Sequence, residues 1–577
     1  MSTSTTVTPA AAPTPPTTPP TSRLSRRAGA RQAAWTATAI VPALLVIIPV
    51  AMLAVSIFTP STDVWSQQWE TRLPAEIVST IVLVTGVTIC SIVLGTSLAW
   101  LVAAHRFPGR SVLGWALVLP LAVPGYILGF VTTSVFGFAG PVQTWWRGQF
   151  GADAWFPEIR SMTGAIVTLT LTLYPYVYLM ARAALRDQTA DAYFVARTLG
   201  ASAAEATRRV VLPLLRPAIA AGAAIVVMET LTDFATVQYF GVDTLSVGVF
   251  RIWRGTYDRD AAAELATLVL VFAVLAIGLE RIMRGRARFG RAGGQEAGIP
   301  PRRLRGWRAV AATVGATSVV VLGFGAPTAQ LAVWAIREQT GNRGTPVVDR
   351  YLDFLGNSLV LTVTTVVICL VVAVLVTNAR RFGAERTVAP ANRLTAIGYA
   401  VPGPVVAMGV VLAVVALDDL LDGIGLGLPG AVATGSFVAL AYAYAVRFVG
   451  PALGTVEAGL GQVSDEVTAS ARSLGAPPRV VLGRIHLPLS RASIITAAVL
   501  VGVDALKELP IALLLRPIGF DTLPVWVYNL ASESRFEQAA LPAITIIAVA
   551  LIPVAILCRQ LDHRDPSVPP VDPGAVV

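Results

Sequence analysis

The stretch DAYFVARTLGASAAEATRRVVLPLLRP, residues Asp191–Pro217, is a polar and arginine-rich interruption between two apolar runs. A second stretch, EVTASARSLGAPPRVVLGRIHLPLSRA, occupies residues Glu466–Ala492. At an offset of 275 residues, the separation of Asp191 and Glu466, the segment ARTLGA aligns with ARSLGA and one Leu-Pro dipeptide aligns with another. The chain therefore contains the same loop twice, which indicates two related halves.

Six pairs of residues repeat at this offset, and we predict that they build the two loops. The pairs are Asp191 and Glu466, Ala196 and Ala471, Arg197 and Arg472, Gly200 and Gly475, Ala201 and Ala476, and Pro213 and Pro488. In each copy the glycine follows a run with helical periodicity, and glycine readily adopts the left-handed conformation that closes a helix. Each loop should therefore contain a helix that ends at a tight glycine corner.

The segment after each glycine carries a signal for a second short helix. Ser202 and Glu205 form the S-x-x-E pattern of a capping box in the first copy. In the second copy the dipeptide Pro477–Pro478 supplies the backbone angle favoured in a first helical turn. We expect Pro213 and Pro217 to end the short helix of the first copy as the chain returns to an apolar run.

The composition is that of a membrane protein with several spans. Hydrophobic residues make up 55% of the 577 residues, charged residues make up 14%, and the mean hydropathy is +0.68. The net charge of +10 could suggest nucleic acid, but only Lys507 is a lysine and most arginines lie in short segments between apolar runs. Such arginines orient a membrane protein, so the charge does not imply a nucleic-acid partner.

The apolar runs predict twelve transmembrane helices, because a span needs about 20 consecutive apolar residues. The predicted spans are residues 33–58, 76–104, 111–138, 161–181, 217–240, 261–280, 309–336, 355–378, 394–417, 429–449, 492–515 and 539–558. With the N-terminus inside, most arginines fall in the inner segments, as the positive-inside rule requires. Both termini and both repeated loops are therefore predicted to be cytoplasmic, in a plasma or inner membrane.

The spans and loops divide the chain into two halves joined by a basic linker. Six spans precede the linker, so the second half begins on the same side as the first and the repeats are parallel. The predicted segments are a disordered Thr/Pro-rich tail (1–32), the first half (33–290, with its loop at 182–216), the linker (291–308), the second half (309–560, with its loop at 450–491) and a disordered C-terminal tail (561–577).

Five ionisable residues lie inside predicted spans, where charges are costly and usually face a wet cavity or a partner. They are Glu229 and Asp233 in the fifth span, and Asp504, Lys507 and Glu508 in the eleventh. The offset of 275 aligns Glu229 with Asp504 and Asp233 with Glu508, and each pair has the i, i+4 spacing of one helix face. Two interpretations stay open: Lys507 only neutralises its neighbours, or these residues line a translocation pathway.

The sequence predicts no catalytic residues and no resident metal. A hard cation would suit carboxylate oxygens, but the chain has no cluster of His, Cys and carboxylate residues with metal-ligand spacing. Its histidines, His105, His486 and His563, fall in predicted inner loops or in the tail. A Walker A loop needs Gly-Lys before Ser or Thr, whereas Lys507 stands between Leu506 and Glu508.

Both repeated loops resemble the EAA loop of ABC importer permeases, whose short coupling helix docks into a groove on a separate ATP-binding subunit. The family has a glutamate two residues before the Ala-Arg pair, whereas this chain has Phe194 in the first copy and Ala469 in the second. Asp191 and Glu466, three residues earlier on the same helical side, are the candidates to replace it. The loop shape matches the family, and the polar part of the docking surface departs from it.

Two further strings resemble fused ferric-iron ABC permeases, in which two six-helix halves form one chain. They are METLTDFATVQYFG (Met228–Gly241) and KELPIALLLRPIGFDTL (Lys507–Leu523). The resemblance spans roughly residues 75 to 560. It implies an all-α type I importer fold with twelve transmembrane helices in two parallel repeats.

The resemblance also implies partners. Two copies of an ATP-binding subunit would use ATP-Mg on the cytoplasmic face, an external solute-binding protein would deliver the solute, and this chain would bind no cofactor of its own. Permeases for thiamine, polyamines or another small solute remain alternatives to ferric iron. A twelve-span secondary transporter of the major facilitator type is the rival from another class, but its charged loop between spans two and three is reduced here to HRFPGR, residues 105–110.

Overall fold

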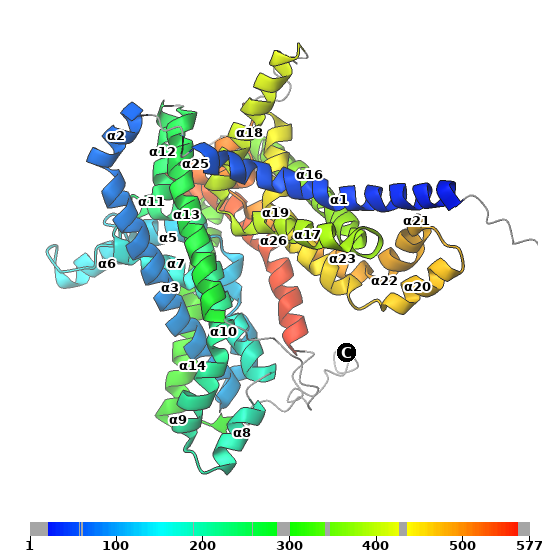
Figure 1. The fold of residues 1–577 in the computed structure, drawn as a ribbon. Helices are drawn as coiled ribbons and strands as arrows, with labels where there is room; N and C mark the ends of the chain where they lie inside the picture. Colours follow the sequence, from blue (N-terminus) through cyan, green and yellow to red (C-terminus); the bar gives the residue numbers. More distant parts are fainter. Residues whose placement is uncertain are drawn as a thin grey trace, which may run out of the picture.

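A computed structural model describes residues 21–56, 58, 62–187, 190–256, 258–284, 301–340, 347–425 and 435–562 of the chain. Nearly all of these residues are helical (Figure 1). Long apolar runs form helices in a membrane because a helix satisfies its own backbone hydrogen bonds where no water is available. The predicted tails lie largely outside the described residues, as does much of the linker.

The first half of the chain contains fifteen helical segments among the described residues. They are α1 (Thr21–Ser56), α2 (Thr62–Thr71), α3 (Leu73–Ala104), α4 (Arg110–Ala116), the 3-10 turn η1 (Leu119–Ala122), α5 (Gly125–Phe136), α6 (Pro141–Phe150), α7 (Met162–Asp187), α8 (Ala190–Thr198), α9 (Ala203–Ala206), the π-helical turn η2 (Thr207–Val211), α10 (Leu212–Thr232), α11 (Ala235–Tyr239), α12 (Leu245–Thr256) and α13 (Arg259–Arg284).

The second half repeats this order. Its helices are α14 (Trp307–Val320), the π-helical η3 (Val321–Gly325), α15 (Ala326–Thr340), α16 (Val347–Phe382), α17 (Glu385–Ala396), the 3-10 turn η4 (Ile397–Ala400), α18 (Gly403–Gly423), α19 (Phe437–Leu460), α20 (Asp465–Ser473), α21 (Pro478–Val481), the π-helical η5 (Leu482–His486), α22 (Leu487–Leu489), α23 (Arg491–Lys507), α24 (Pro510–Leu515), α25 (Leu523–Ser532) and α26 (Phe536–Asp562).

The described residues include 11 helices that are long and apolar enough to cross a membrane. A twelfth candidate is the pair Pro478–Leu489 and Arg491–Lys507, which is bent by 74° at its break. The bend separates the first segment, which belongs to the second repeated loop, from the span itself. The predicted all-α fold with twelve spans in two repeats is confirmed.

Three predicted spans are shorter or less continuous in the structure. The third and ninth spans break at Val-Pro-Gly, where Pro124 and Pro402 are extended and precede α5 and α18. Proline lacks the N–H for a helical bond and disfavours a helical residue before it, which explains both breaks. The eleventh predicted span ends at Lys507, because Glu508 leaves the helix and caps α24 instead.

The helix α1 begins at Thr21, inside the segment that the sequence predicts to be a disordered tail. Residues 21–32 are rich in arginine and alanine and contain no proline, unlike the residues before them. Good helix formers therefore extend the first span toward the N-terminus. The bounds of the first half, 33–290, do not include this extension.

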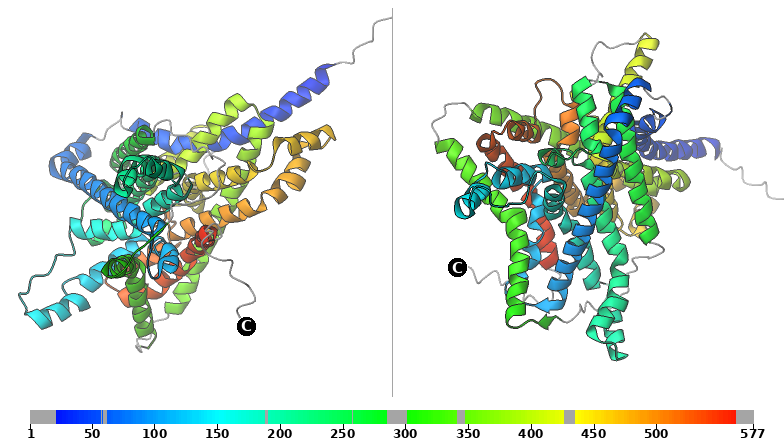
Figure 2. Two further views of the ribbon diagram at one scale, coloured as in Figure 1. Left: turned by 90° about the horizontal axis from the view of Figure 1, so that it is seen from below. Right: turned by 90° about the vertical axis from the view of Figure 1, so that its left-hand side faces the viewer.

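The two halves interlock through their first helices. The helix α1 packs along α16, α17 and α18 of the second half, and Figure 2 shows the blue α1 beside yellow-green helices of that half. In return, α14 packs on α4, and α15 packs on α5. The linker is also attached, because β1 (His105–Arg106) pairs in parallel with β2 (Arg302–Arg303). The core of each half is therefore completed by the other half.

Candidate functional site

The two repeated loops have the same backbone at their glycine corners. Gly200 has a φ of +91° and Gly475 a φ of +83°, so the predicted left-handed conformation is confirmed in both. The N–H of Ala201 donates to the carbonyl of Ala196 at 3.1 Å, and the N–H of Gly200 donates to that of Arg197 at 3.2 Å. The second copy repeats both bonds at 3.1 and 3.0 Å, which completes a Schellman motif in each loop.

The second short helix of each loop begins largely as its sequence predicts. The N–H of Glu205 donates to Ser202 Oγ at 3.2 Å, and Pro478 occupies the first turn of α21. The expectation that Pro213 and Pro217 end the first short helix is wrong. Pro213 lies in the first turn of α10 and Pro217 lies inside it, so the helix continues into the span. Pro213 has no N–H to donate, and the π-helical turn η2 just before it, where the N–H of Leu212 bonds to the Thr207 carbonyl, changes the hydrogen-bond register at this point.

The loops differ in how they join the membrane. In the first copy η2 leads into α10 without interruption, and α10 continues to Thr232. In the second copy η5 leads into the short α22, and the chain bends at Ser490 before α23. Figure 1 shows the loops at separate corners of the molecule, α8 and α9 at the bottom and α20 to α22 on the right.

The first loop is held in place by apolar packing. Tyr193, Ala206 and Val211 are buried in one cluster with Val102 near the end of α3 and Phe107 just after it. Ala196 and Ala201 of the repeated motif pack at the edge of the same cluster. Among the described residues this packing is apolar, so its stability depends on buried apolar area.

The second loop is held by a buried polar network at the equivalent positions. His486 Nδ1 donates to Asn378 Oδ1 at 2.5 Å, and Thr468 Oγ1 lies 3.0 Å from His486 Nε2. Arg381 Nη1 donates to Thr468 Oγ1 at 2.8 Å, and its Nη2 donates to the carbonyls of Leu460 and Val463. Burial lowers the pKa of His486 below the ordinary histidine value, and the nearby Arg381 guanidinium lowers it further.

Several predicted loop residues face solvent. Arg197, Arg472, Gly200, Gly475, Glu466 and Pro488 are exposed, Ala471, Ala476 and Pro213 are partly exposed, and the side chain of Asp191 lies outside the described residues. The sequence reasoning overlooked the leucine of each ARxLGA motif. Leu199 is 82% exposed and Leu474 is 88% exposed. Two apolar side chains displayed at equivalent corners suit docking to another protein, and their place in the repeated motif was the available signal.

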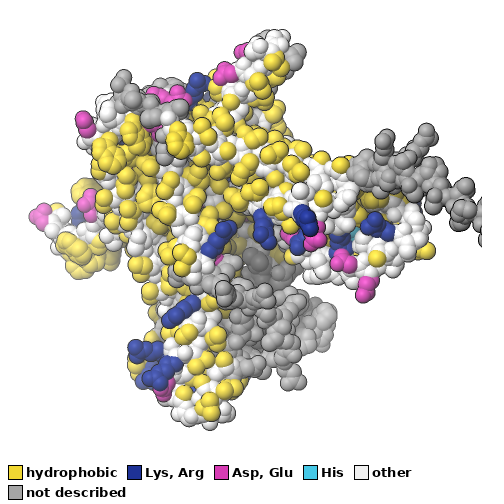
Figure 3. Space-filling view, viewed as in Figure 1, with side chains coloured by type: hydrophobic (Ala, Val, Ile, Leu, Met, Phe, Trp, Pro, Cys, Tyr) yellow, Lys and Arg dark blue, Asp and Glu magenta, His cyan; other side chains and the backbone are white. Residues whose placement is uncertain are grey.

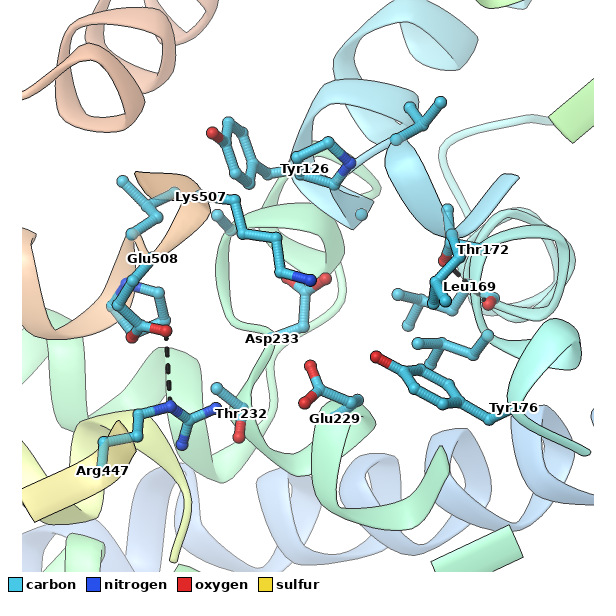
Figure 4. A pocket seen from close by; sticks show the side chains of 18 residues that line it. Tyr126, Leu169, Thr172, Tyr176, Glu229, Thr232, Asp233, Arg447, Lys507 and Glu508 are labelled. Atoms are coloured by element: carbon cyan, nitrogen blue, oxygen red, sulfur yellow. Dashed lines mark hydrogen bonds and ion pairs between the residues drawn. The ribbon is translucent and has the colours of Figure 1, made fainter. Parts of the chain in front are cut away.

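A charged cavity lies between the two halves, and Figure 4 shows its lining. The cavity holds about 110 Å³. Its polar lining comes from Tyr126 on α5, Thr172 and Tyr176 on α7, Glu229 and Thr232 on α10, Asp233, Arg447 on α19, Lys507 at the end of α23, and Glu508. Four of the five predicted pathway residues therefore line one cavity, and the fifth, Asp504, is paired with Lys507.

Two of these carboxylates cap the helices that follow them. Asp233 accepts hydrogen bonds from the N–H and the hydroxyl of Thr236 at 2.8 and 2.5 Å, which caps α11. Glu508 accepts a bond from the N–H of Ile511 at 3.3 Å at the start of α24. Each also follows the last residue of its span, so the expectation that each pair shares one helix face does not hold. Local capping bonds turn these side chains away from the helix.

Glycines 125 and 403 bring the broken spans close to these two carboxylates. A Cβ at Gly125 would collide with Asp233 Oδ2, and one at Gly403 would lie 3.0 Å from Glu508 Oε1. Both glycines stand at the start of a helix, α5 or α18, where the backbone dipole favours a negative charge. The duplicated Val-Pro-Gly sequence thus places each broken span against the equivalent carboxylate of its own half.

Arg447 is a cavity residue that the sequence reasoning missed. Its Nε lies 3.4 Å from Glu508 Oε2, and its Nη1 donates to the Val401 carbonyl at 2.8 Å. The side chains of Arg447 and Glu508 are only 6% and 8% exposed. An arginine within the tenth predicted span was the available signal, because such a charge needs a partner.

The remaining charged pair is more open to the cavity. Lys507 Nζ lies 2.8 Å from Asp504 Oδ1, and these side chains are 27% and 25% exposed. Glu229 lines the cavity, and its carboxylate makes no hydrogen bond or ion pair with the other residues that the structure describes. Within the same described residues, no group of three His, Cys, Asp or Glu side chains could hold a metal ion. The site therefore offers separated carboxylates and no chelating cluster.

An aromatic layer joins the halves beside the cavity. Tyr528 donates its hydroxyl to Gln238 Oε1 at 2.6 Å, and Tyr239 donates to the Tyr528 carbonyl at 3.4 Å. The ring of Tyr528 also meets those of Phe234 and Phe250. Since Phe234 directly follows Asp233, these contacts tie the two halves together next to the charged residues.

A duplicated helical bundle, with one cavity between its halves and two matching loops beyond it, defines a membrane transport protein. Residues 91–284 and 386–564 each match the family described as binding-protein-dependent transport system inner membrane component. These segments cover more than half of the chain, so the protein belongs to this family. It is a fused permease of the ABC importer class, with both halves in one polypeptide.

Three relatives illustrate the breadth of the family. The Fe(3+)-transport system permease protein FbpB 2 of Haemophilus influenzae is 25% identical over 84% of this chain and 89% of its own length. The sulfate transport system permease protein CysT of Salmonella typhimurium is 28% identical over 43% of this chain and 89% of its own. The molybdenum transport system permease protein ModB of Mycobacterium tuberculosis is 30% identical over 33% of this chain and 72% of its own.

Proposed function

We propose that this permease carries ferric iron, which an external solute-binding protein delivers and two cytoplasmic ATP-binding subunits drive across the membrane. The observation that carries the cargo assignment is the charge of the central site. Three carboxylates, from Glu229, Asp233 and Glu508, line the cavity with two basic side chains, and a fourth, from Asp504, is paired with Lys507. An excess of negative charge at low dielectric attracts a cation and repels an oxyanion such as sulfate.

Because the carboxylates are separated, the site suits the passage of a cargo ion better than its tight binding. A trivalent cation prefers oxygen ligands, which this lining supplies from both halves. Since no three His, Cys, Asp or Glu side chains among the described residues are grouped to hold a metal ion, the cargo would be held weakly and released quickly. The relative named for Fe(3+) transport also aligns with both halves of this chain, whereas the sulfate and molybdenum relatives align with one half or less.

We assign the coupling role to the two repeated loops. Leu199 and Leu474 project from equivalent glycine corners and would each enter a groove on one ATP-binding subunit. Figure 3 shows one group of basic side chains at the lower left of the molecule, on the side of the first loop, and a row of them at mid-height that runs toward the second loop on the right. The positive-inside rule supports a cytoplasmic location for that side and for both termini.

In this proposal the chain performs no covalent chemistry. The partner subunits bind and hydrolyse ATP-Mg, and their closure moves both loops and the spans attached to them. The uninterrupted path from η2 to α10 would carry this motion to Glu229, and α23 would carry it to Asp504 and Lys507. The cavity between the halves would then open alternately to the outside and the inside.

Uptake by the complete importer in proteoliposomes tests the proposal. With its ATP-binding subunits and binding protein, the permease should import radiolabelled ferric iron on addition of ATP and should not import sulfate, molybdate, thiamine or putrescine. Selective uptake of one of those solutes would overturn the iron assignment. Uptake driven by an ion gradient without the ATP-binding subunits would instead support a secondary transporter.

A further inference from the structure

Lys507 breaks the symmetry of the cavity. The carboxylates come in equivalent pairs from the two halves, Glu229 with Asp504 and Asp233 with Glu508. Both basic side chains come from the second half alone. At the same offset of 275 residues, the first half has Thr172 and Thr232, which also line the cavity but carry no charge.

The two basic side chains are held differently. Arg447 is nearly enclosed and is fixed between Glu508 and the Val401 carbonyl. Lys507 makes one ion pair, with Asp504, and retains about a quarter of its exposure. Figure 4 shows its side chain extending into the cavity. Arg447 therefore resembles a structural counter-ion, whereas Lys507 is free to change its partner.

Chemistry also separates Lys507 from the other basic residues of this chain, which are all arginines. Guanidinium is planar and suits fixed bidentate contacts, while ammonium is a compact point charge on a flexible stem with four carbons. An ammonium can rotate away from a carboxylate by changing its side-chain rotamers alone. Lys507 is also the last residue of α23, where the backbone leaves the helix.

We propose that Lys507 is a tethered cation that occupies the carboxylate site of the empty permease and must be displaced by the cargo. This inference rests on the proposed transport of a cation. The ammonium neutralises Asp504 and lies in the cavity that Glu229 also lines. A tethered group competes at a high effective concentration, so a dilute monovalent ion would not displace it.

A trivalent ion would displace the ammonium, because Coulomb attraction to the same carboxylates scales with its charge. Lys507 thereby admits only ions of high charge to the site, which selects polyvalent over monovalent cations. It also weakens the hold on the cargo, since the returning ammonium competes for Asp504. Selectivity and rapid release would follow from the same side chain.

Terbium(III) binding to the purified complex in lipid nanodiscs tests this role without transport. Tyr126 and Tyr176 line the cavity and would sensitise the emission of a bound ion. Compared with the wild type, Lys507→Gln should bind terbium(III) about tenfold more tightly or more, because a competing positive charge is removed. Lys507→Arg keeps the charge and, because a guanidinium can hold a carboxylate through two bonds, should bind terbium(III) no more tightly than the wild type does.

A cysteine variant separates charge from folding. In a background with Cys90, Cys369 and Cys558 changed to Ser, Lys507→Cys should bind terbium(III) as tightly as Lys507→Gln. Modification with aminoethyl methanethiosulfonate restores an ammonium and should return the affinity to the wild-type value. The neutral methyl reagent on the same protein should not.

Equal terbium(III) affinity before and after the charge is restored would overturn the proposal, as would absent sensitised emission from Lys507→Gln. Neither result depends on which solute the importer carries. Conversely, failure of iron uptake in proteoliposomes would overturn the proposed cargo, while the effect of Lys507 on a trivalent probe would still be measured. The two experiments therefore fail separately.

Discussion

The two halves of this permease repeat one backbone plan, but different side chains hold each half in place. At equivalent positions the first half has Val211, Tyr193, Thr172 and Thr232, and the second has His486, Thr468, Arg447 and Lys507. The first repeated loop packs through apolar surface, whereas the second is held by buried hydrogen bonds. The two halves therefore share the backbone shape of the loops and of the cavity lining, but the side chains at equivalent positions differ in polarity.

Changes at the glycine corners, whose shape both loops share, should have the largest effect on association with the ATP-binding subunits. Replacing Gly200 and Gly475 together by Val places β-branched residues at positive φ, a conformation that costs about 1 to 3 kcal/mol at each site. The Schellman corners should be lost, and association with the ATP-binding subunits should be abolished while membrane insertion remains. Co-purification from solubilised membranes measures the association. Undiminished recovery of the ATP-binding subunits would show that the corners are not needed for docking.

The cavity carboxylates should give the next largest effect. Asp504→Asn leaves Lys507 without its ion-pair partner, so we expect uptake to fall about tenfold or more. Glu229→Gln removes a carboxylate that has no described partner, so a smaller, severalfold loss is expected. ATP-driven uptake at matched complex assembly provides the measurement. Unchanged uptake in both variants would favour a purely structural role for these charges.

The polar fastening of the second loop predicts a difference in local stability. His486→Ala leaves the buried Asn378 Oδ1 without its partner and removes one of the two polar contacts of Thr468, which should cost about 2 to 3 kcal/mol. The matched change in the first loop, Val211→Ala, removes apolar contacts only and should cost about 1 kcal/mol. Hydrogen exchange of the loop amides measures both opening free energies. Equal losses would remove the proposed distinction between the two attachments.

A change of pH should have a smaller effect on loop stability, and only in the second loop. The pKa of His486 is lowered in the closed loop, so its contribution to stability is fully present above the ordinary histidine pKa of about 6.5. As the pH falls below that value, the opened loop takes up a proton first and the closed loop loses stability. Hydrogen exchange between about pH 7.5 and 5.5 measures this change. The first loop, residues 190–216, contains no histidine and serves as the internal control.

Some of the site was accessible from the sequence because it depends on local backbone chemistry. Glycine at 200 and 475 closes a helix through bonds within six residues, so the motif alone predicts the corner. The prolines at 124 and 402 are also local signals, because a proline in an apolar run predicts a break in the helix at that point. The sequence does not predict that Asp233 and Glu508 cap helices, because both fall within apolar runs that continue beyond the helix end.

Sequence by itself determined the membrane class, the duplication, the twelve spans and the helical corners of the loops, because hydropathy, repeat register and glycine chemistry act over short distances. Tertiary structure alone decided that Arg447 meets Glu508, that His486 meets Asn378 and that α1 packs on the opposite half. These contacts join residues far apart in the chain, and their energy arises only after the halves have folded against each other. The choice of partner for each buried charge is therefore a property of the packed molecule.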